Sequence, residues 1–201
     1  MFEPGSTVKP LTVISGLTSG KFNVGSKIDT SPGRMYLDYA WVRDTRNYGE
    51  LDLDGIIKKS SNMGVSKIAL ELTDDEFMRT LYAVGFGVQT GLGIQGEARG
   101  RLSPRPNWSD FEKATWSYGY GFMVTPMQLA QAYSVLGAGG IKRTPTLLKR
   151  PEHEEIEGER VIQPEIASQV VKMMEQVTQK GGTGTRARVD GYRVAGKTGT
   201  S

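Results

Sequence analysis

Apolar side chains recur at helical spacing in several stretches of the chain. In 164–177 they share one face, and in 6–17 they stand three positions apart. Both patterns predict helices, and shorter helices are expected at 51–59 and 63–72. Pro10 is compatible with the helix at 6–17, because N–H groups near the first turn of a helix have no intrahelical partner.

Two further helices are marked by capping boxes, in which Thr is followed three residues later by Glu or Gln. The boxes are Thr73 with Glu76 and Thr125 with Gln128. They predict helices over 74–84 and 126–136, and glycine follows each of them. Pro126 supports the second helix, because proline is favoured at the first helical position.

The remaining stretches predict loops, a hairpin and one strand. Residues 21–50 look like loops and short strands, and 87–110 is rich in Gly, Pro and Arg, which predicts a long ordered loop. The range 141–162 suggests a hairpin around an acidic run, and Tyr192 to Thr198 alternates as a strand does. A lone strand needs partners. Motifs also lie close to both ends of the chain, where termini usually fray, so we expect a piece of a longer protein.

Composition narrows the classes of function. The chain has 201 residues, of which 37% are hydrophobic, enough for a sizeable core. The formal net charge of +3 is mild and the basic residues are scattered, so we expect no nucleic-acid partner. The absence of cysteine excludes disulfides, thiolate metal sites and a cysteine nucleophile. The only histidine, His153, lies in an acidic run and is expected to be solvated, so neither a metal nor a cofactor is predicted.

Ser6 and Lys9 form the first of three short motifs that could carry chemistry. Residues three apart at a helix start share a face, so the Ser6 hydroxyl and the Lys9 amine are expected within hydrogen-bond reach. A serine hydroxyl becomes a good nucleophile only when a base removes its proton. With no usable histidine, a neutral lysine is the natural base, and the helix N-terminus favours an oxyanion nearby. Taken alone, a Ser-x-x-Lys spacing is no more than chance would supply in a chain of this length.

The second motif is Ser60-Ser61-Asn62, between two predicted helices. Ser60 could relay a proton between Lys9 and a leaving group, and Asn62 could hold a substrate amide. Taken alone, serine and asparagine at a helix junction are more often simple caps.

The third motif is Lys197-Thr198-Gly199, at the end of the predicted strand. Lys197 and Thr198 could bind a carboxylate, and Gly199 would let a substrate backbone approach closely. The N–H of Thr200 could join that of Ser6 as an oxyanion hole. Taken alone, this motif fits a surface strand that ends in a turn equally well.

Together and in this order, the three motifs form the signature set of penicillin-binding proteins and serine β-lactamases. Four segments around them, 3–10, 59–67, 118–126 and 196–200, resemble the class B penicillin-binding transpeptidases. Within that family the chain is most similar to the division-specific penicillin-binding protein 3 group of Gram-negative bacteria. The resemblance covers nearly the whole chain.

The resemblance implies an α+β fold, in which a five-stranded antiparallel sheet is flanked by helices beside an all-helical subdomain. Residues 1–201 are then expected to be a partial transpeptidase domain, truncated at both ends and mostly helical, with most of the sheet missing. The helical subdomain is expected at roughly 20–160.

The family's reaction is the cross-linking of peptidoglycan in cell-wall synthesis. A serine attacks the D-Ala-D-Ala bond of a stem peptide, releases the last D-Ala and passes the acyl group to an amine, and β-lactams mimic that dipeptide. By position, the resemblance makes Ser6 the nucleophile and Lys9 the base, with Ser60 also catalytic. It assigns substrate binding to Asn62, Lys197, Thr198, Gly199 and Thr200.

The expected location is the periplasmic face of the bacterial inner membrane, with divisome membrane proteins as partners. No apolar run approaches the roughly 20 residues of a membrane span, and no signal peptide is visible. We therefore expect any anchor to lie outside this chain.

Three other functions use the same motifs. A serine β-lactamase would hydrolyse the drug, but no segment resembles the glutamate-bearing loop of the class A enzymes, and the middle motif is Ser-Ser-Asn rather than Ser-Asp-Asn. A D,D-carboxypeptidase would transfer the acyl group to water. A sensor domain would be acylated once by penicillin in order to signal.

Two other patterns are expected to be structural. The run 91–96 spells a dinucleotide-binding fingerprint but lacks the strand before it and the helix after it, so we interpret it as a loop. An aromatic group could stack sugars or bases, but core packing is favoured. Its members are Trp108, Phe111, Trp116, Tyr118, Tyr120 and Phe122.

Overall fold

The described part of the chain is mostly helical. The computed structural model describes residues 1–103, 108–151, 153–154 and 156–199. Within those ranges the α-helices are α1 (Lys9–Thr18), α2 (Leu53–Lys59), α3 (Asn62–Glu71), α4 (Asp74–Ala83), α5 (Asp110–Ser117), α6 (Pro126–Gly137) and α7 (Pro164–Thr178). Two 3-10 turns are η1 (Gly5–Val8) and η2 (Thr185–Ala187). The helices predicted from the sequence pattern are confirmed, with small shifts at their ends.

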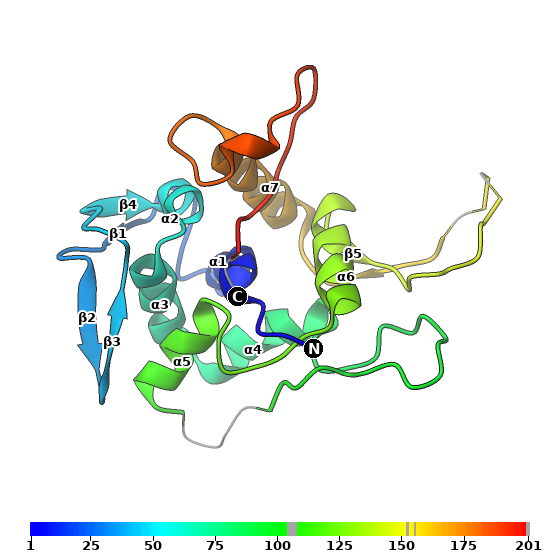
Figure 1. Cartoon of the computed structure of the whole chain (residues 1–201), viewed down its shortest axis with the longest axis horizontal. Helices are drawn as coiled ribbons and strands as arrows, with labels where there is room; N and C mark the ends of the chain where they lie inside the picture. Colours follow the sequence, from blue (N-terminus) through cyan, green and yellow to red (C-terminus); the bar gives the residue numbers. More distant parts are fainter. Residues whose placement is uncertain (104–107, 152, 155, 200–201) are drawn as a thin grey trace.

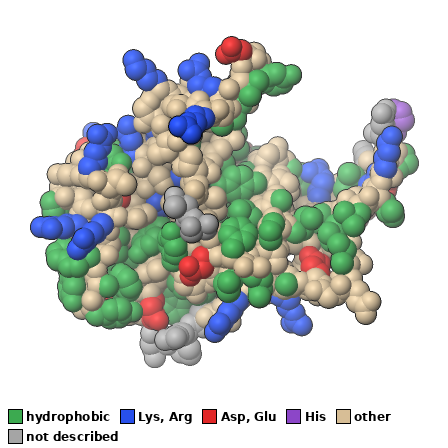
Figure 2. All heavy atoms as spheres, viewed as in Figure 1, with side chains coloured by type: hydrophobic (Ala, Val, Ile, Leu, Met, Phe, Trp, Pro, Cys, Tyr) green, Lys and Arg blue, Asp and Glu red, His purple; other side chains and the backbone are tan. Residues whose placement is uncertain are grey.

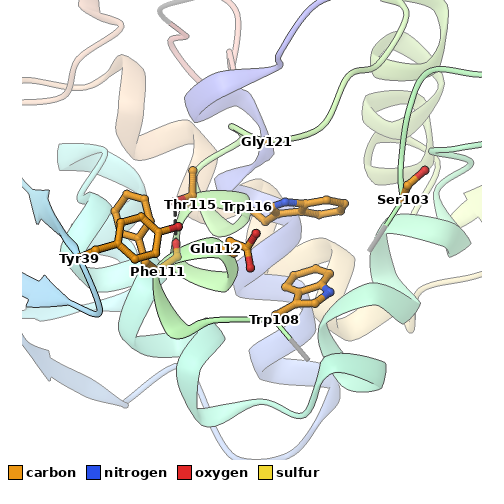
Figure 3. A pocket seen from close by; sticks show the side chains of 8 residues that line it. All are labelled: Tyr39, Ser103, Trp108, Phe111, Glu112, Thr115, Trp116 and Gly121. Carbon is orange, nitrogen blue, oxygen red and sulfur yellow. Dashed lines mark hydrogen bonds between the residues drawn. The ribbon is translucent and has the colours of Figure 1, made fainter. Parts of the chain in front are cut away.

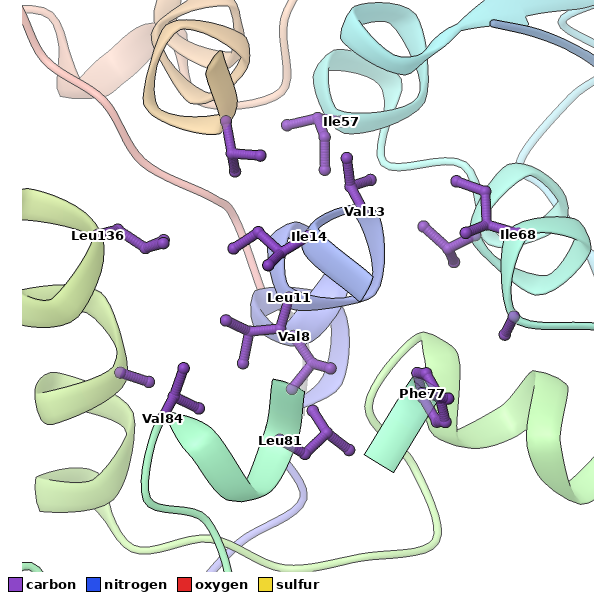
Figure 4. Packing of buried hydrophobic residues seen from close by; sticks show 14 of the residues in the cluster. Val8, Leu11, Val13, Ile14, Ile57, Ile68, Phe77, Leu81, Val84 and Leu136 are labelled. Atoms are coloured by element: carbon purple, nitrogen blue, oxygen red, sulfur yellow. The ribbon is translucent and has the colours of Figure 1, made fainter. Parts of the chain in front are cut away.

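Helix α1 lies at the centre of the molecule, with the other helices around it (Figure 1). Its residues from Lys9 to Gly16 are all buried. In Figure 4 its apolar side chains point in several directions, with Val13 toward Ile57 of α2 and Ile14 toward the side of Leu136 of α6. A helix buried around its whole circumference belongs in a core. The first sequence motif therefore lies at the start of the central helix of the fold.

The start of this helix differs from the prediction. Residues Gly5–Val8 form a 3-10 turn, and the α-helix begins only at Lys9. In this turn the Lys9 N–H donates to the Ser6 carbonyl. Pro10 explains the change, because it has no N–H with which to bond the Ser6 carbonyl in the α-helical pattern. Ser6 therefore lies in the tighter turn that precedes the helix.

The strands form antiparallel pairs. Within the described ranges these are β1 (Lys27–Asp29) with β4 (Glu50–Asp52), β2 (Arg34–Leu37) with β3 (Ala40–Arg43), and β5 (Ile141–Lys142) with β6 (Glu159–Arg160). The short strands expected in 21–50 and the hairpin expected in 141–162 are confirmed. The described residues contain two-stranded ribbons and no larger sheet.

Capping side chains decide where several helices begin. The boxes Thr73 with Glu76 and Thr125 with Gln128 are both formed. A third box, Ser109 with Glu112, opens α5. The sequence prediction missed this helix, because the Gly- and Pro-rich composition up to residue 110 concealed the box.

The strand predicted from Tyr192 to Thr198 is wrong. This segment has no strand partner among the described residues, although the Gly196 N–H donates to the Met174 carbonyl of α7. The alternating pattern is not enough by itself, because a strand is stable only when it forms hydrogen bonds with neighbouring strands. The segment is instead held against α7 and the start of the chain.

On the face that Figure 2 shows, the basic side chains of the described residues are scattered and form no single basic patch. His153 is exposed, as expected. Across the described ranges, no helix is both long enough and apolar enough to cross a bilayer. The run 91–96 is a loop, as predicted.

Candidate active site

The first two sequence motifs meet at the side chain of Lys9. This side chain is 0% exposed, although it carries an amine. Its Nζ lies 2.6 Å from the Ser60 carbonyl oxygen, 3.1 Å from Ser60 Oγ and 2.7 Å from Asn62 Oδ1. A buried amine is tolerated only where its hydrogen bonds are made. The α2–α3 junction supplies those acceptors and so fixes the amine in place.

Ser60 joins the second motif to the third. It ends α2 in the left-handed conformation, with φ of 57°, which turns the chain into α3. Its Oγ accepts hydrogen bonds from Lys197 Nζ at 2.8 Å and from Lys9 Nζ at 3.1 Å. Two lysines from distant parts of the chain therefore converge on one hydroxyl oxygen.

The environment lowers the pKa of both lysines. Burial, and then the positive charge of Lys197, lower the pKa of Lys9 to about 7, against a smaller opposing effect of Asp44. Burial lowers the pKa of Lys197 to about 8. Near neutral pH, Lys9 can therefore exist as an uncharged amine, the form that accepts a proton.

Ser6 lies in η1, three residues before Lys9, and the described structure shows no hydrogen bond between their side chains. The serine is half-buried in η1. Within the described residues its hydroxyl makes no hydrogen bond, and the Lys9 amine bonds to Ser60 and Asn62 instead. The predicted Ser6–Lys9 hydrogen bond is absent, because the long lysine side chain extends to the acceptors at the α2–α3 junction.

Asp44 holds the second motif in place, and the sequence prediction missed it. Its carboxylate accepts a hydrogen bond from Ser61 Oγ at 2.6 Å and from the backbone N–H groups of Asn62 and Met63 at 2.5 and 3.0 Å. The Asn62 side chain donates to the Arg43 carbonyl at 2.9 Å. A carboxylate at this end satisfies N–H groups that α3 leaves free and complements its dipole. No local pattern links Asp44 to residues so far along the chain.

The third motif is placed beside η1. Lys197 Nζ donates to the Thr198 carbonyl at 2.9 Å, and the hydroxyls of Thr198 and Thr183 lie 2.7 Å apart. A Cβ on Gly199 would lie 2.9 Å from Thr7 Cγ2, so a larger residue would push this segment away from the turn that carries Ser6. Thr200, the remaining predicted site residue, lies outside the described residues.

The loop 118–121 holds the chain just before Ser6. The Gly5 N–H donates to the Gly119 carbonyl at 2.9 Å, and the Gly121 N–H donates to the Glu3 side chain at 2.9 Å. A Cβ on Gly119 would lie only 2.0 Å from the Gly5 carbonyl oxygen. Gly119 therefore lets the loop approach the Gly5 backbone closely, and this contact positions η1.

The aromatic group predicted for the core lies close to this loop. Trp116 and Phe122 are buried, with ring centroids 4.9 Å apart, and Trp108 packs 4.6 Å from Trp116. Figure 3 shows the two tryptophans on one side of a cavity of about 240 Å³, with Tyr39 and Phe111 across it. No residue of the three motifs lines this cavity, so the chemistry is expected at the Lys9 cluster instead.

Comparison with known proteins shows the family of the chain. The family model described as the penicillin binding protein transpeptidase domain matches residues 1–201. The peptidoglycan D,D-transpeptidase FtsI of Escherichia coli (strain K12) is 43% identical over 201 residues, which are 100% of this chain and 34% of that protein. The probable peptidoglycan D,D-transpeptidase PbpC of Pseudomonas aeruginosa is 38% identical over 200 residues, 100% of this chain and 35% of that protein. The chain thus spans about a third of the length of these curated relatives.

Two solved structures share the fold. A crystal structure described as a peptidoglycan glycosyltransferase from Burkholderia ambifaria has a TM-score of 0.94 at 39% identity, covering 100% of this chain and 63% of that one. The transpeptidase domain of Burkholderia pseudomallei penicillin-binding protein 3 has a TM-score of 0.93 at 39% identity, covering 98% of this chain and 60% of that one. The fold class implied by the sequence resemblance is confirmed.

Proposed function

The chain belongs to the penicillin-binding protein transpeptidase family, and from that membership we propose that it carries the acylation centre of a peptidoglycan D,D-transpeptidase of septal cell-wall synthesis. The observation that best supports this is the convergence of Lys9 and Lys197 on the Ser60 hydroxyl, at 3.1 and 2.8 Å. A pair of lysines with lowered pKa around one hydroxyl suits proton transfer near neutral pH.

Ser6 is the proposed nucleophile and Lys9 its base. A neutral Lys9 amine keeps two N–H groups for the Ser60 carbonyl and Asn62 Oδ1, and its lone pair remains for the Ser6 proton. As that proton leaves, Ser6 Oγ bonds to the carbonyl carbon of the penultimate D-Ala. The peptide C–N bond then breaks, and the Ser60 hydroxyl gives its proton to the leaving nitrogen of the terminal D-Ala. Lys9 returns the proton that it took from Ser6 to Ser60 Oγ, 3.1 Å away, and so becomes neutral again.

The remaining residues hold the substrate in this proposal. Lys197 and Thr198 bind the terminal carboxylate, and Asn62 binds a backbone amide. Gly199 keeps the adjoining segment close to η1, because a Cβ at this position would lie only 2.9 Å from Thr7 Cγ2. Thr200 and Ser6 would supply N–H groups to the oxyanion. In the second half-reaction an amine of another stem peptide attacks the acyl carbon and releases Ser6.

β-Lactams would acylate the same serine, because they present a strained amide beside a carboxylate. The proposed setting is the periplasmic face of the inner membrane, with divisome membrane proteins as partners. The relatives named as D,D-transpeptidases support this choice over a β-lactamase, a D,D-carboxypeptidase or a penicillin sensor.

Mass spectrometry after benzylpenicillin treatment tests the assignment. The test protein is this chain extended at both ends to the length of its relatives, here called the extended protein. The adduct should appear on the peptide that contains Ser6, and a Ser6→Ala variant should remain unlabelled. An adduct on Ser60, or labelling of the Ser6→Ala variant, would contradict the proposal. Rapid release of hydrolysed drug would indicate a β-lactamase instead.

A further inference from the structure

Tyr133 reaches from α6 to the turn that carries Ser6. Its hydroxyl donates to the Thr7 carbonyl oxygen at 3.0 Å, across 126 positions of sequence. Thr7 is the residue directly after Ser6 in η1. Apart from this hydroxyl, the tyrosine ring packs against the apolar core. One side chain therefore ties the core helix α6 to the backbone beside the nucleophile.

The Thr7 carbonyl lacks one of its possible backbone donors. In a continuing 3-10 turn it would accept a hydrogen bond from the N–H of the residue three positions later. That residue is Pro10, which has no N–H. The donor three positions later is therefore missing at the point where η1 passes into α1, and the Tyr133 hydroxyl supplies a donor to this carbonyl.

The Ser6 side chain makes no hydrogen bond with the rest of the described structure, so the backbone of η1 decides where its hydroxyl lies. Among the described residues, that backbone is held by the Gly119 carbonyl on the Gly5 N–H, at 2.9 Å, and by Tyr133 on the Thr7 carbonyl. The two contacts lie on either side of Ser6 in the sequence. Burial raises the pKa of Tyr133 above its ordinary value, so the phenol stays a donor throughout the working pH range.

We propose that Tyr133 is a positioning residue for acylation, which fixes the η1 backbone so that the Ser6 hydroxyl meets the substrate carbonyl in the reactive geometry. This role rests on the proposed function of Ser6. Tyr133 acts through the backbone and touches neither the substrate nor the transferred proton.

The test compares Tyr133→Phe with the extended protein for the rate and the final extent of labelling by a fluorescent penicillin. The variant removes one hydroxyl and keeps the ring that packs in the core. We expect the acylation rate to fall roughly 10- to 100-fold, because a small misplacement of reacting groups is costly. The final extent should still reach one label per molecule, and the pH midpoint set by Lys9 should not move.

Two matched variants separate this role from a loss of folding. Tyr82→Phe makes the same chemical change on an exposed tyrosine of α4 and should leave the rate unchanged. Replacement of Tyr133 by 3-fluorotyrosine keeps the donor and should restore the rate that Phe loses. An unchanged rate in Tyr133→Phe would overturn the proposal, as would a reduced final extent at an unchanged rate. Labelling of Ser6→Ala would instead refute the proposed function itself.

Discussion

Lys197 Nζ donates to Ser60 Oγ at 2.8 Å, although 137 positions of sequence separate the two residues. Lys9 Nζ donates to the same oxygen at 3.1 Å. The two amines therefore share an acceptor, and the positive charge of Lys197 helps to lower the pKa of Lys9. This relationship gives the site a pH dependence that experiments can measure.

Acylation should depend on the loss of a proton from Lys9. Because the pKa of Lys9 is lowered to about 7, the amine is protonated and inactive below that pH and neutral above it. The acylation rate of the extended protein should rise with pH up to about 7 and then level off, falling roughly tenfold per pH unit on the acidic side. Lys9→Ala should lose at least a factor of about 100 in rate.

Stopped-flow measurement of penicillin acylation between pH 5 and 9 would follow this profile. Lys172→Ala, on the exposed side of α7, is the matched control and should keep the wild-type profile. A rate that stays flat down to pH 5 would exclude Lys9 as the base.

Removal of the Lys197 charge should move the acidic limb of that profile. The positive charge of Lys197 lowers the pKa of Lys9, so Lys197→Met should shift the Lys9 midpoint to higher pH. The midpoint is informative even if the variant binds penicillin poorly, because it does not depend on the absolute rate. An unmoved midpoint would show that the two amines are not coupled.

Asp44→Asn should destabilise the protein and disturb Asn62. The neutral amide cannot replace a carboxylate that accepts three hydrogen bonds at the start of α3. We expect a loss of about 1–3 kcal/mol in the free energy of unfolding, measured by urea titration. Asp190→Asn, at an exposed position, is the control and should change stability by less than about 0.5 kcal/mol. Equal stability of the two variants would refute the capping role of Asp44.

Gly119→Ala should separate η1 from the loop 118–121. The added Cβ would lie 2.0 Å from the Gly5 carbonyl oxygen, and Gly119 has φ of +90°, which is unfavourable for alanine. The strain should cost about 1–3 kcal/mol or more, and the displaced turn should slow acylation. Gly137→Ala is the matched control in α6, because nothing lies within 4 Å of the added Cβ. That control should be stabilising by about 0.5–1 kcal/mol, as thermal unfolding would show.

Residues 1–201 produced alone should acylate more slowly than the extended protein. Within the described ranges, the segment before Lys197 has no strand partner, so little backbone pairing holds Lys197 and Thr198 opposite Ser6. Catalytic groups must be held within about 0.5 Å. We expect at least a tenfold lower rate of fluorescent-penicillin labelling for the short form. Equal rates and equally cooperative unfolding would contradict this prediction.

Much of the helical structure follows from local sequence. The capping boxes at Thr73 and Thr125 satisfy N–H groups within one turn, so their effect can be predicted without knowing the fold. The apolar face of 164–177 likewise predicts α7. The strand predicted at 192–198 failed because pairing depends on neighbours that local sequence does not contain.

The sequence alone also identified the three motifs, because Ser6, Ser60 and Lys197 stand in an order and spacing that the family resemblance makes specific. Only the tertiary structure decided how they meet. It directs Lys9 to Ser60 and Asn62 rather than to Ser6, and it brings in Asp44 and Tyr133. These contacts join residues that are far apart in the sequence, and each depends on how the helices pack around α1. A local sequence pattern contains no information about which distant residues become neighbours. A buried amine needs hydrogen-bond acceptors, and the packing of the helices decides which residues supply them.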